Sequence, residues 1–457
     1  MDSSYLSKEN LIYKTLASND KIYIREQKGL FQRIRRSLNF FLMAIFALVP
    51  FIKYNSSQAV YFDLQQQQFH FFALTLFPQD LLIVCFIFVF SAFLLFYITK
   101  LFGRVWCGFT CPQTVWMLIF NWVERRIEGS HSHSKSLDSQ PFTAKKLVKK
   151  SVKHLIWAAI SLLTALVFIS YFVPVEQLYM PFFTMQSSSL TVSWVLFFAV
   201  CTYINAGWIR EKMCQHMCPY ARFQSAMFDK STKLVSYDQQ RGENRGRRKR
   251  LQEKREDMGD CVNCNLCVQV CPVGIDIRNG LQYECINCAL CVDACDMIME
   301  KFNYQKGLIA FTSEQTPFNG WKRHAGYGSF IAITLMAIIV WGQTWQDFEV
   351  NIIRDRQALY RVNQEGKIEN SFIIKIRNKS SQSKQYKIEL AGLDSAKIIG
   401  ASQVEVFPHE LRTISIVVSV DNPLIDKKND ISFEIVDESS KSQIVKHNSF
   451  YSGERGW

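Results

Sequence analysis

Residues 261–272 read CVNCNLCVQVCP, and residues 285–296 read CINCALCVDACD. Each run has the spacing C-x2-C-x2-C-x3-C, and together they hold eight of the 14 cysteines in the chain. The spacing is typical of bacterial two-cluster ferredoxins, in which the fourth cysteine of one run binds the cluster of the other. It predicts two [4Fe–4S] clusters, the first held by Cys261, Cys264, Cys267 and Cys295, the second by Cys271, Cys285, Cys288 and Cys291.

Zinc and disulfides are the competing interpretations of these runs. Disulfides are disfavoured in a reducing cytoplasm, and zinc rarely uses two tandem four-cysteine runs of this spacing. The second run carries Asp296 where the first carries Pro272. This change leaves the ligands intact and adds negative charge beside a cluster.

The apolar residues outside these runs are segregated into blocks. The chain has 457 residues, of which 48% are hydrophobic, and a net charge of +13 that lies almost wholly between the blocks. This pattern excludes a single soluble domain and a disordered chain. Five segments can cross a bilayer of about 30 Å; they are Leu38–Ile52, Leu81–Thr99, Leu155–Val173, Val192–Ile209 and Ala325–Trp345.

The distribution of Lys and Arg predicts the orientation. Residues 1–36 contain eight and residues 100–153 contain ten, whereas 54–80 and 174–190 contain none. Positive charge favours the cytoplasmic side, so we expect the N-terminus and the cysteine runs in the cytoplasm and the tail after Trp345 outside. The charge then serves topology and contact with anionic lipid, without nucleic-acid binding.

Two further segments have a distinct composition. The stretch from Gln240 to Arg255 is strongly basic, which is usual for a solvated or lipid-facing surface. The tail contains period-two runs of apolar residues, which predict antiparallel strands and a small β-sandwich without cysteine; the inward positions are Phe372, Ile374, Ile376, Tyr386, Ile388, Leu390, Ile414, Ile416, Val418, Ile431, Phe433 and Ile435.

Four cysteines form two matching C-x3-C-P motifs, Cys107 with Cys111 and Cys214 with Cys218. Residues at i and i+4 share a helix face, so we expect each pair to present two sulfurs together. The proline either occupies the first position of the next helix or interrupts the hydrogen bonds of a continuous helix. Packing of the second span on the fourth would then create a four-thiolate site for Cu(I), zinc or an iron–sulfur cluster. Buried packing of the thiols is the alternative.

His216, inside the second motif, is a possible auxiliary ligand, although a single histidine is a weak signal. Cys85 and Cys201 lie within apolar spans, and we expect them to serve core packing. No acid–base dyad, nucleophile or phosphate loop stands out. The only chemistry that the sequence predicts is therefore metal and electron chemistry.

Three stretches carry a family resemblance: WCGFTCPQTVW (106–116), REKM (210–213) leading to CPYARFQ (218–224), and YD (237–238) with RGENRG (241–246). They resemble the cytochrome c oxidase accessory proteins called CcoG, FixG or RdxA. The outer tail, with RDR (354–356) and LYR (359–361), resembles the start of that family's immunoglobulin-like domain. The resemblance covers nearly the whole chain.

The resemblance implies a multi-domain protein of the bacterial inner membrane. The expected fold class is a five-span α-helical bundle with a cytoplasmic bacterial-type 2[4Fe–4S] ferredoxin domain and a periplasmic immunoglobulin-like β-sandwich. The expected parts are an N-terminal segment (1–36), a membrane domain with four spans (37–228), a basic linker (229–258), the ferredoxin domain (259–305), the fifth span (325–345) and the outer domain (346–457).

The implied activity is reduction of Cu(II) to Cu(I) in support of a cbb-type oxidase. Copper, as substrate or bound ion, would be held by Cys107, Cys111, Cys214 and Cys218, and the partners would be copper carriers or the oxidase assembly machinery, with an unidentified electron donor. Cluster potentials near −400 mV would suffice to reduce Cu(II). Two alternatives remain open: an electron relay to a quinone or an outer redox partner without bound copper, and a non-enzymatic assembly scaffold.

Overall fold

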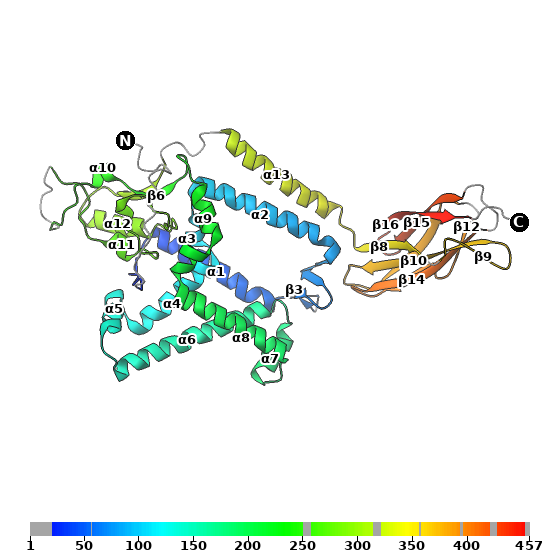
Figure 1. Cartoon of the computed structure of the whole chain (residues 1–457), viewed down its shortest axis with the longest axis horizontal. Helices are drawn as coiled ribbons and strands as arrows, with labels where there is room; N and C mark the ends of the chain where they lie inside the picture. The colour runs from blue at the N-terminus through cyan, green and yellow to red at the C-terminus, as the bar shows by residue number, and fades with distance from the viewer. Residues whose placement is uncertain are drawn as a thin grey trace. The chain divides into compact units, whose positions relative to one another are not determined.

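The computed structural model describes residues 21–55, 57–249, 257–313, 321–355, 358–393, 396–420 and 427–452 (Figure 1). The expected N-terminal segment and basic linker are therefore described only from residue 21 onward and outside 250–256. The chain divides into two compact units. One comprises Met1–Phe51 with Leu82–Ile338, and the other comprises Ile52–Leu81 with Ile339–Trp457.

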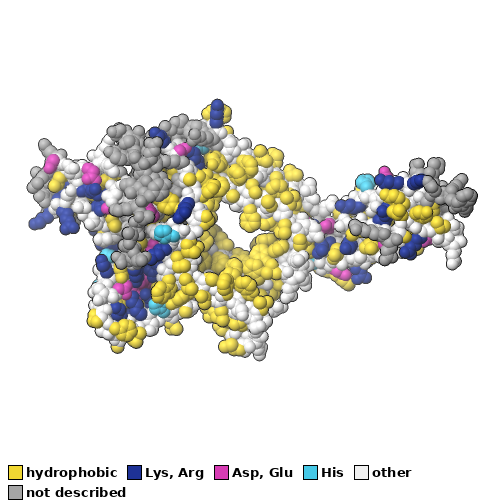
Figure 2. Space-filling view, viewed as in Figure 1, with side chains coloured by type: hydrophobic (Ala, Val, Ile, Leu, Met, Phe, Trp, Pro, Cys, Tyr) yellow, Lys and Arg dark blue, Asp and Glu magenta, His cyan; other side chains and the backbone are white. Residues whose placement is uncertain are grey.

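Five helices of the described chain are long and apolar enough to cross a membrane, as the sequence predicts. Large hydrophobic side chains on their surfaces are exposed, including Phe40, Phe88, Leu155 and Ile333, and such side chains cover much of the visible face of the spans (Figure 2). Large exposed apolar surfaces of this kind mark contact with a membrane or with another protein. The spanning helices are α1 (Leu30–Leu48), α2 (Leu81–Phe102), α6 (Ala144–Ile169), α8 (Ser189–Tyr203) and α13 (Trp321–Gln343).

The two cysteines within the spans do not serve core packing. Cys85 on α2 and Cys201 on α8 are both exposed, so the expectation from the sequence is wrong. Periodicity cannot decide this point, because every face of these helices is apolar and lipid accepts a thiol as readily as a core does.

Short helices connect the spans. After α2 come α3 (Val105–Phe109), α4 (Pro112–Glu128) and α5 (His131–Ser139), and α7 (Val175–Phe183) joins α6 to α8. The fourth span continues as π-helix η5 (Ile204–Ile209), followed by π-helix η6 (Met213–Met217) and α9 (Pro219–Ala226). Helix α4 packs against α6 and η5, and α6 packs against α8.

The segment with the two cysteine runs folds around a two-stranded antiparallel sheet. Strand β6 (Leu234–Tyr237) pairs with β7 (Ile309–Thr312). Between them lie α10 (Gln239–Gly242), α11 (Leu266–Gln269), the 3₁₀ turn η7 (Ile277–Asn279) and α12 (Leu290–Lys301). Small apolar clusters around the cysteines supply the core of this segment.

The tail forms the predicted β-sandwich of two antiparallel sheets. One has the order β12-β14-β10-β8 with β9 beside β10, and the other has the order β13-β11-β15-β16. The alternating residues named from the sequence face inward, with Phe372, Ile374 and Phe433 fully buried. The strands are β8 (Phe348–Arg354), β9 (Arg361–Val362), β10 (Ile368–Asn378), β11 (Lys384–Ala391), β12 (Ala396–Ile399), β13 (Gln403–Val406), β14 (Leu411–Val420), β15 (Lys428–Asp437) and β16 (Gln443–Tyr451).

The segment between the first two spans belongs to the same unit as the sandwich. It contains the small hairpin β1 (Lys53–Tyr54) with β2 (Ser57–Gln58), and a sheet of β3 (Val60–Asp63), β4 (Gln68–Phe71) and β5 (Leu74–Leu76). A buried ion pair joins Asp80 to Lys379 at 2.8 Å, and the Arg377 guanidinium lies 4.4 Å from the Phe77 ring centroid. The segment and the tail therefore pack together within one unit.

Candidate metal centres

The eight ferredoxin-type cysteines are grouped around two cavities. Cys261, Cys264, Cys267 and Cys295 line the first. Cys271, Cys285, Cys288 and Cys291 line the second, to which Cys267 also extends. The groups therefore combine cysteines of both runs. Cys264 is the exposed member, so the first cavity is the one with a ligand at the protein surface.

The backbone repeats the same conformation in both runs. Asn263 and Asn265 have φ of 51° and 58°, and the equivalent Asn287 and Ala289 have φ of 50° and 56°. Left-handed residues within such turns direct successive N–H groups into a concavity that favours anions, a geometry common at iron–sulfur sites. The helices α11 and α12 then begin at the next residue of each run, so the two runs form a pseudo-repeat.

A buried arginine beside the second cavity also fits an anionic group. Arg35 on α1 is 1% exposed, and its Nε and Nη1 have no hydrogen-bond partner within the described chain. Arg35 lies close enough to Cys288 for their charges to interact. A buried cation is costly unless negative charge lies nearby; Asp293 supplies part of that charge, and a cluster held by four thiolates would add to it. Burial raises the pKa of Cys285 to about 11, and metal ligation would offset this by stabilising the thiolate.

The second cysteine run docks on the membrane helices through two caps. The Asp293 carboxylate accepts hydrogen bonds from the N–H groups of Phe31 and Gln32, at 3.2 and 2.9 Å, in the first turn of α1. Asn287 Nδ2 donates to the Phe102 carbonyl at 3.1 Å, at the end of α2. The first N–H groups and the last carbonyl groups of a helix have no partner within the helix. The second cysteine run therefore supplies hydrogen-bond partners to the start of α1 and the end of α2, and the second cavity is the one next to these helix ends.

Gly108 brings the first C-x3-C-P motif against this same run. A Cβ on Gly108 would lie 2.6 Å from the Ile286 carbonyl oxygen and 2.9 Å from Cys288 Cα. Only glycine permits this approach. Cys107, the neighbour of Gly108, consequently belongs to one apolar cluster with Cys288.

The two C-x3-C-P motifs have the same local geometry. Cys107 and Cys214 lie in short helices, α3 and η6, whereas Cys111 and Cys218 are extended residues at the N-caps of α4 and α9. Pro112 and Pro219 open those helices, which is one of the two roles expected from the sequence. Each cysteine pair therefore flanks a break between helices. The expectation of one shared helix face is wrong, because the proline ends the preceding helical turn.

All four thiols of these motifs line one cavity of about 520 Å³. Its walls are largely apolar and include Trp106, Trp116 and Phe168, together with Arg104 and Met213. His216 is exposed and is not among the lining residues, so the structure does not place it with the thiols. Burial and the neighbouring Cys111 and Cys107 thiols raise the pKa of Cys214 to about 12.

Two glutamines hold the motifs together. Gln113, next to Pro112, donates from Nε2 to the carbonyls of Asn205 and Arg210 at 3.3 and 3.2 Å. Gln224, on α9, accepts a hydrogen bond from Cys107 Sγ at 3.0 Å. These contacts join α4 to η5 and α3 to α9, so the expected packing of the second span on the fourth is not what assembles the site. Each motif contributes one glutamine that reaches the other.

The four thiols share a cavity without converging on a point. Across the described residues, no three His, Cys, Asp or Glu side chains lie close enough to hold a single metal ion. For a cubane cluster this is no obstacle, since its thiolates bind four different irons. A mononuclear ion in the C-x3-C-P cavity would require the thiols to rotate inward.

Comparison with known proteins places these features in a family. Residues 209–314 match a "4Fe-4S dicluster domain", and residues 338–453 match the "IG-like fold at C-terminal of FixG". The chain is 32% identical over 426 residues to "Nitrogen fixation protein FixG" of Rhizobium meliloti, covering 84% of this chain and 81% of that one. The chain belongs to the FixG/RdxA family.

Two further relatives, RdxA and RdxB, agree with this membership. "Protein RdxA" of Cereibacter sphaeroides is 32% identical over 400 residues, covering 82% of this chain and 83% of RdxA. "Protein RdxB" of the same organism is 30% identical over 462 residues, covering 96% and 97%. A crystal structure of a FixG-related protein from Vibrio parahaemolyticus matches 24% of this chain and 98% of its own, at 27% identity and a TM-score of 0.23. The FixG-family chain is thus an iron–sulfur membrane protein with an electron-transfer role.

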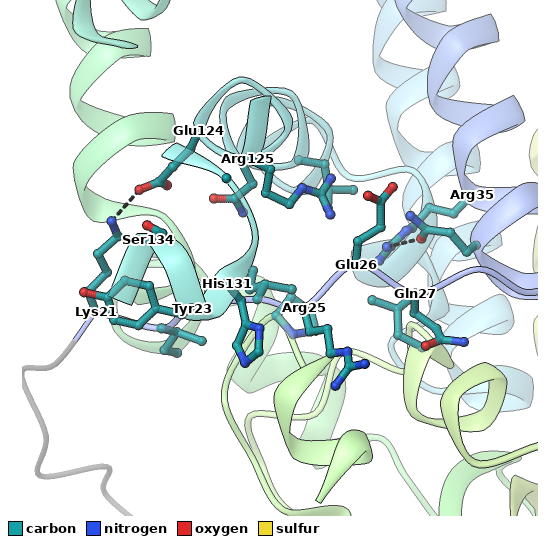
Figure 3. A pocket seen from close by; sticks show the side chains of 18 residues that line it. Lys21, Tyr23, Arg25, Glu26, Gln27, Arg35, Glu124, Arg125, His131 and Ser134 are labelled. Carbon is teal, nitrogen blue, oxygen red and sulfur yellow. Dashed lines mark hydrogen bonds and ion pairs between the residues drawn. The ribbon is translucent and has the colours of Figure 1, made fainter. Parts of the chain in front are cut away.

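A buried ion network lies behind the C-x3-C-P cavity of this FixG-family protein. Glu124 on α4 pairs with Arg210, at the end of η5, at 2.8 Å, and Lys21 and Lys153 also contact Glu124. Figure 3 shows Lys21 directed toward Glu124 from the N-terminal segment. Burial alone would raise the pKa of Glu124, but Arg210, Lys21 and Lys153 outweigh it and hold this pKa well below its usual range. These ion pairs therefore link α4 to Arg210, in the segment that precedes the second C-x3-C-P motif.

Several residues of this FixG-family site escape sequence reasoning. Arg35 and Arg104 look like ordinary positive-inside charges, yet both are 1% exposed. Arg104 donates to the Tyr283 carbonyl at 2.9 Å and lines the thiol cavity. Among these residues, only Gln113 and Gln224 have a sequence signal: Gln113 directly follows the first Cys-Pro pair, and Gln224 lies in the helix that the second pair opens.

Proposed function

We propose that this FixG-family protein reduces Cu(II) to Cu(I) in the cavity lined by Cys107, Cys111, Cys214 and Cys218. The observation that carries the proposal is the contact of the first motif, at Gly108, with the Cys288 segment. The [4Fe–4S] clusters, when bound to the two cysteine sets predicted from the sequence, supply electrons singly. Each Cu(II) that accepts one electron becomes Cu(I).

The residues of the cavity favour the reduced ion. Thiolates and the Met213 thioether are soft ligands, which select Cu(I) over harder cations. Burial raises the pKa of the Cys107 thiol, and the Arg104 guanidinium beside it offsets part of that rise.

The cellular setting is part of the proposal. The lysine and arginine distribution supports a bacterial inner-membrane location with the N-terminus and clusters in the cytoplasm and the tail in the periplasm. Copper carriers or the cbb-type oxidase assembly machinery would receive the Cu(I). A cytoplasmic donor of undefined chemistry would supply the electrons.

The size and the aromatic walls of the cavity favour a second candidate function. A volume of about 520 Å³ with walls of Trp106, Trp116, Phe168 and Phe198 exceeds the needs of an ion. These walls suit a quinone, which would make the protein an electron relay without bound copper. Copper content after anaerobic purification separates the two, because the relay requires none.

The test is anaerobic Cu(II) reduction by the full-length protein with its clusters chemically reduced, followed with a Cu(I)-specific chelator. Replacing Cys107 and Cys111 with Ser should abolish Cu(I) retention, slow Cu(II) reduction and leave the iron content unchanged. The matched control replaces Cys85 and Cys201, which are exposed on the spans, and should behave as wild type. Equal copper retention in the two double variants would refute the assignment.

A further inference from the structure

Two histidines from distant parts of the sequence meet in the unit that contains the sandwich. His70 lies on β4, and His409 lies in the turn between β13 and β14. Their ring centroids are 5.3 Å apart, with an interplanar angle of 78°. The chain has only eight histidines, so a contact between two of them across more than 300 residues of sequence is a specific feature.

One nitrogen of His70 is already fixed by the protein. His70 Nδ1 lies 3.0 Å from Oγ1 of Thr75, its cross-strand partner on β5. Thr75 is buried. A hydrogen bond to one ring nitrogen is the usual way in which proteins orient a metal-ligating histidine, and it leaves Nε2 for the metal.

His409, unlike His70, has a ring nitrogen that is not held by a hydrogen bond in the described part of the chain. Its Nδ1 is buried and has no hydrogen-bond partner among the residues that the structure describes. Its backbone has φ of 59°, a left-handed conformation that is costly for a side chain of this size. A buried polar atom without a partner calls for a water or an ion, and here a second imidazole lies beside it.

The contact between the two segments is held by other residues. Asp80 and Lys379 form the buried ion pair described above, and Arg377 lies over Phe77. The histidines are therefore brought together without any need for their own attraction. This is the arrangement expected where a protein preorganises ligands for an ion.

We propose that His70 and His409 form a binding site for Cu(II), separate from the thiol cavity. Imidazole suits copper and zinc, and Cu(II) binds such sites most tightly among the divalent first-row metals. Metal–imidazole bonds are about 2.0–2.1 Å long in zinc sites, and one ion fits between rings spaced as these are. Water would complete the coordination. The choice of copper rests on the proposed function, for which this site would collect the oxidised substrate.

The experiment titrates CuCl2 into the full-length protein with its clusters oxidised, in detergent, and records the Cu(II) electron paramagnetic resonance spectrum. We expect one Cu(II) per chain with hyperfine coupling to two nitrogens. His70→Ala or His409→Ala should weaken binding at least about tenfold and remove the second nitrogen. His447→Ala is the matched control, since His447 is an exposed histidine of the same sandwich, and it should bind as wild type.

Two further variants distinguish a failure of the histidine site from a failure of the proposed function. Thr75→Val removes only the orienting contact and should also weaken binding, which covers the case in which a histidine variant does not fold. Replacing all four C-x3-C-P cysteines with Ser should leave this Cu(II) signal in place. Wild-type protein that gives this Cu(II) signal but does not reduce Cu(II) when its clusters are reduced would overturn the proposed function and keep the site. Equal Cu(II) affinity in wild type and His70→Ala would overturn the site alone.

Discussion

Substituting Gly108 tests the junction between the thiol cavity and the second cysteine run. In Gly108→Ala the added methyl would meet the Ile286 carbonyl oxygen at 2.6 Å, Cys288 Cα at 2.9 Å and Cys288 N at 3.0 Å. All three are backbone atoms in a segment whose neighbouring cysteines are cluster ligands in our proposal, so helix α3 must move instead. Overpacking of this kind costs about 1–3 kcal/mol.

The assay has two readouts, thermal loss of the iron–sulfur absorption and reoxidation of the reduced protein by Cu(II). We expect Gly108→Ala to lose its clusters at lower temperature and to reoxidise more slowly, because α3 is displaced from Cys288. Gly326→Ala is the matched control, since a Cβ at Gly326 on α13 has no atom within 4 Å and alanine favours a helix by about 0.5–1 kcal/mol. If the two variants are equally stable and reoxidise equally fast, the close approach at Gly108 is not real.

Three other substitutions probe the surroundings of the centres. Arg35→Met removes a buried cation beside Cys288 and should lower the midpoint potential of one cluster by about 60 mV, a tenfold change in equilibrium; a redox titration showing both potentials unchanged would contradict the assignment. Asp293→Ala removes the cap of α1 and should cost about 0.5–2 kcal/mol of stability, measured as the denaturation midpoint, with Glu300→Ala, an exposed carboxylate on the same helix, as the control. Glu124→Gln leaves Arg210 without its buried carboxylate partner, while Lys153 keeps Glu128 at 2.8 Å, and should cost about 3–5 kcal/mol. Because the pKa of Glu124 is lowered in the folded state, its stabilisation is present above its ordinary pKa of about 4.3 and is lost as the pH falls below it; a variant with the same acid dependence as wild type would exclude this role.

The sequence predicted the parts of the fold that depend on local pattern. Five apolar blocks became five long helices, and the alternation through Phe372, Ile374 and Ile376 placed those side chains in the sandwich core. Both signals are strong because burial imposes a period on many consecutive residues. Cys85 and Cys201 could not be placed in the same way, since a uniformly apolar helix has no period.

The candidate sites were predictable only where one short motif carries the chemistry. The cysteine runs and C-x3-C-P pairs fall in this class. Gln113 and Gln224 form hydrogen bonds to residues that are distant in the sequence. Gly108 is needed because it has no side chain where the backbone of Cys288 approaches. The partner of His70 lies in a turn more than 300 residues further along the chain, and no local pattern can indicate such a pairing.

The cap that Asp293 places on α1 has a consequence for biogenesis. This carboxylate lies between Cys291 and Cys295, so its position depends on how those cysteines are held. Binding of a metal centre contributes directly to the folding free energy of the segment around it. Through Asp293, that stabilisation reaches the first turn of a membrane helix. We therefore expect iron–sulfur loading to stabilise the position of α1 as well, so that a chain made under iron starvation would carry its defect into the bilayer.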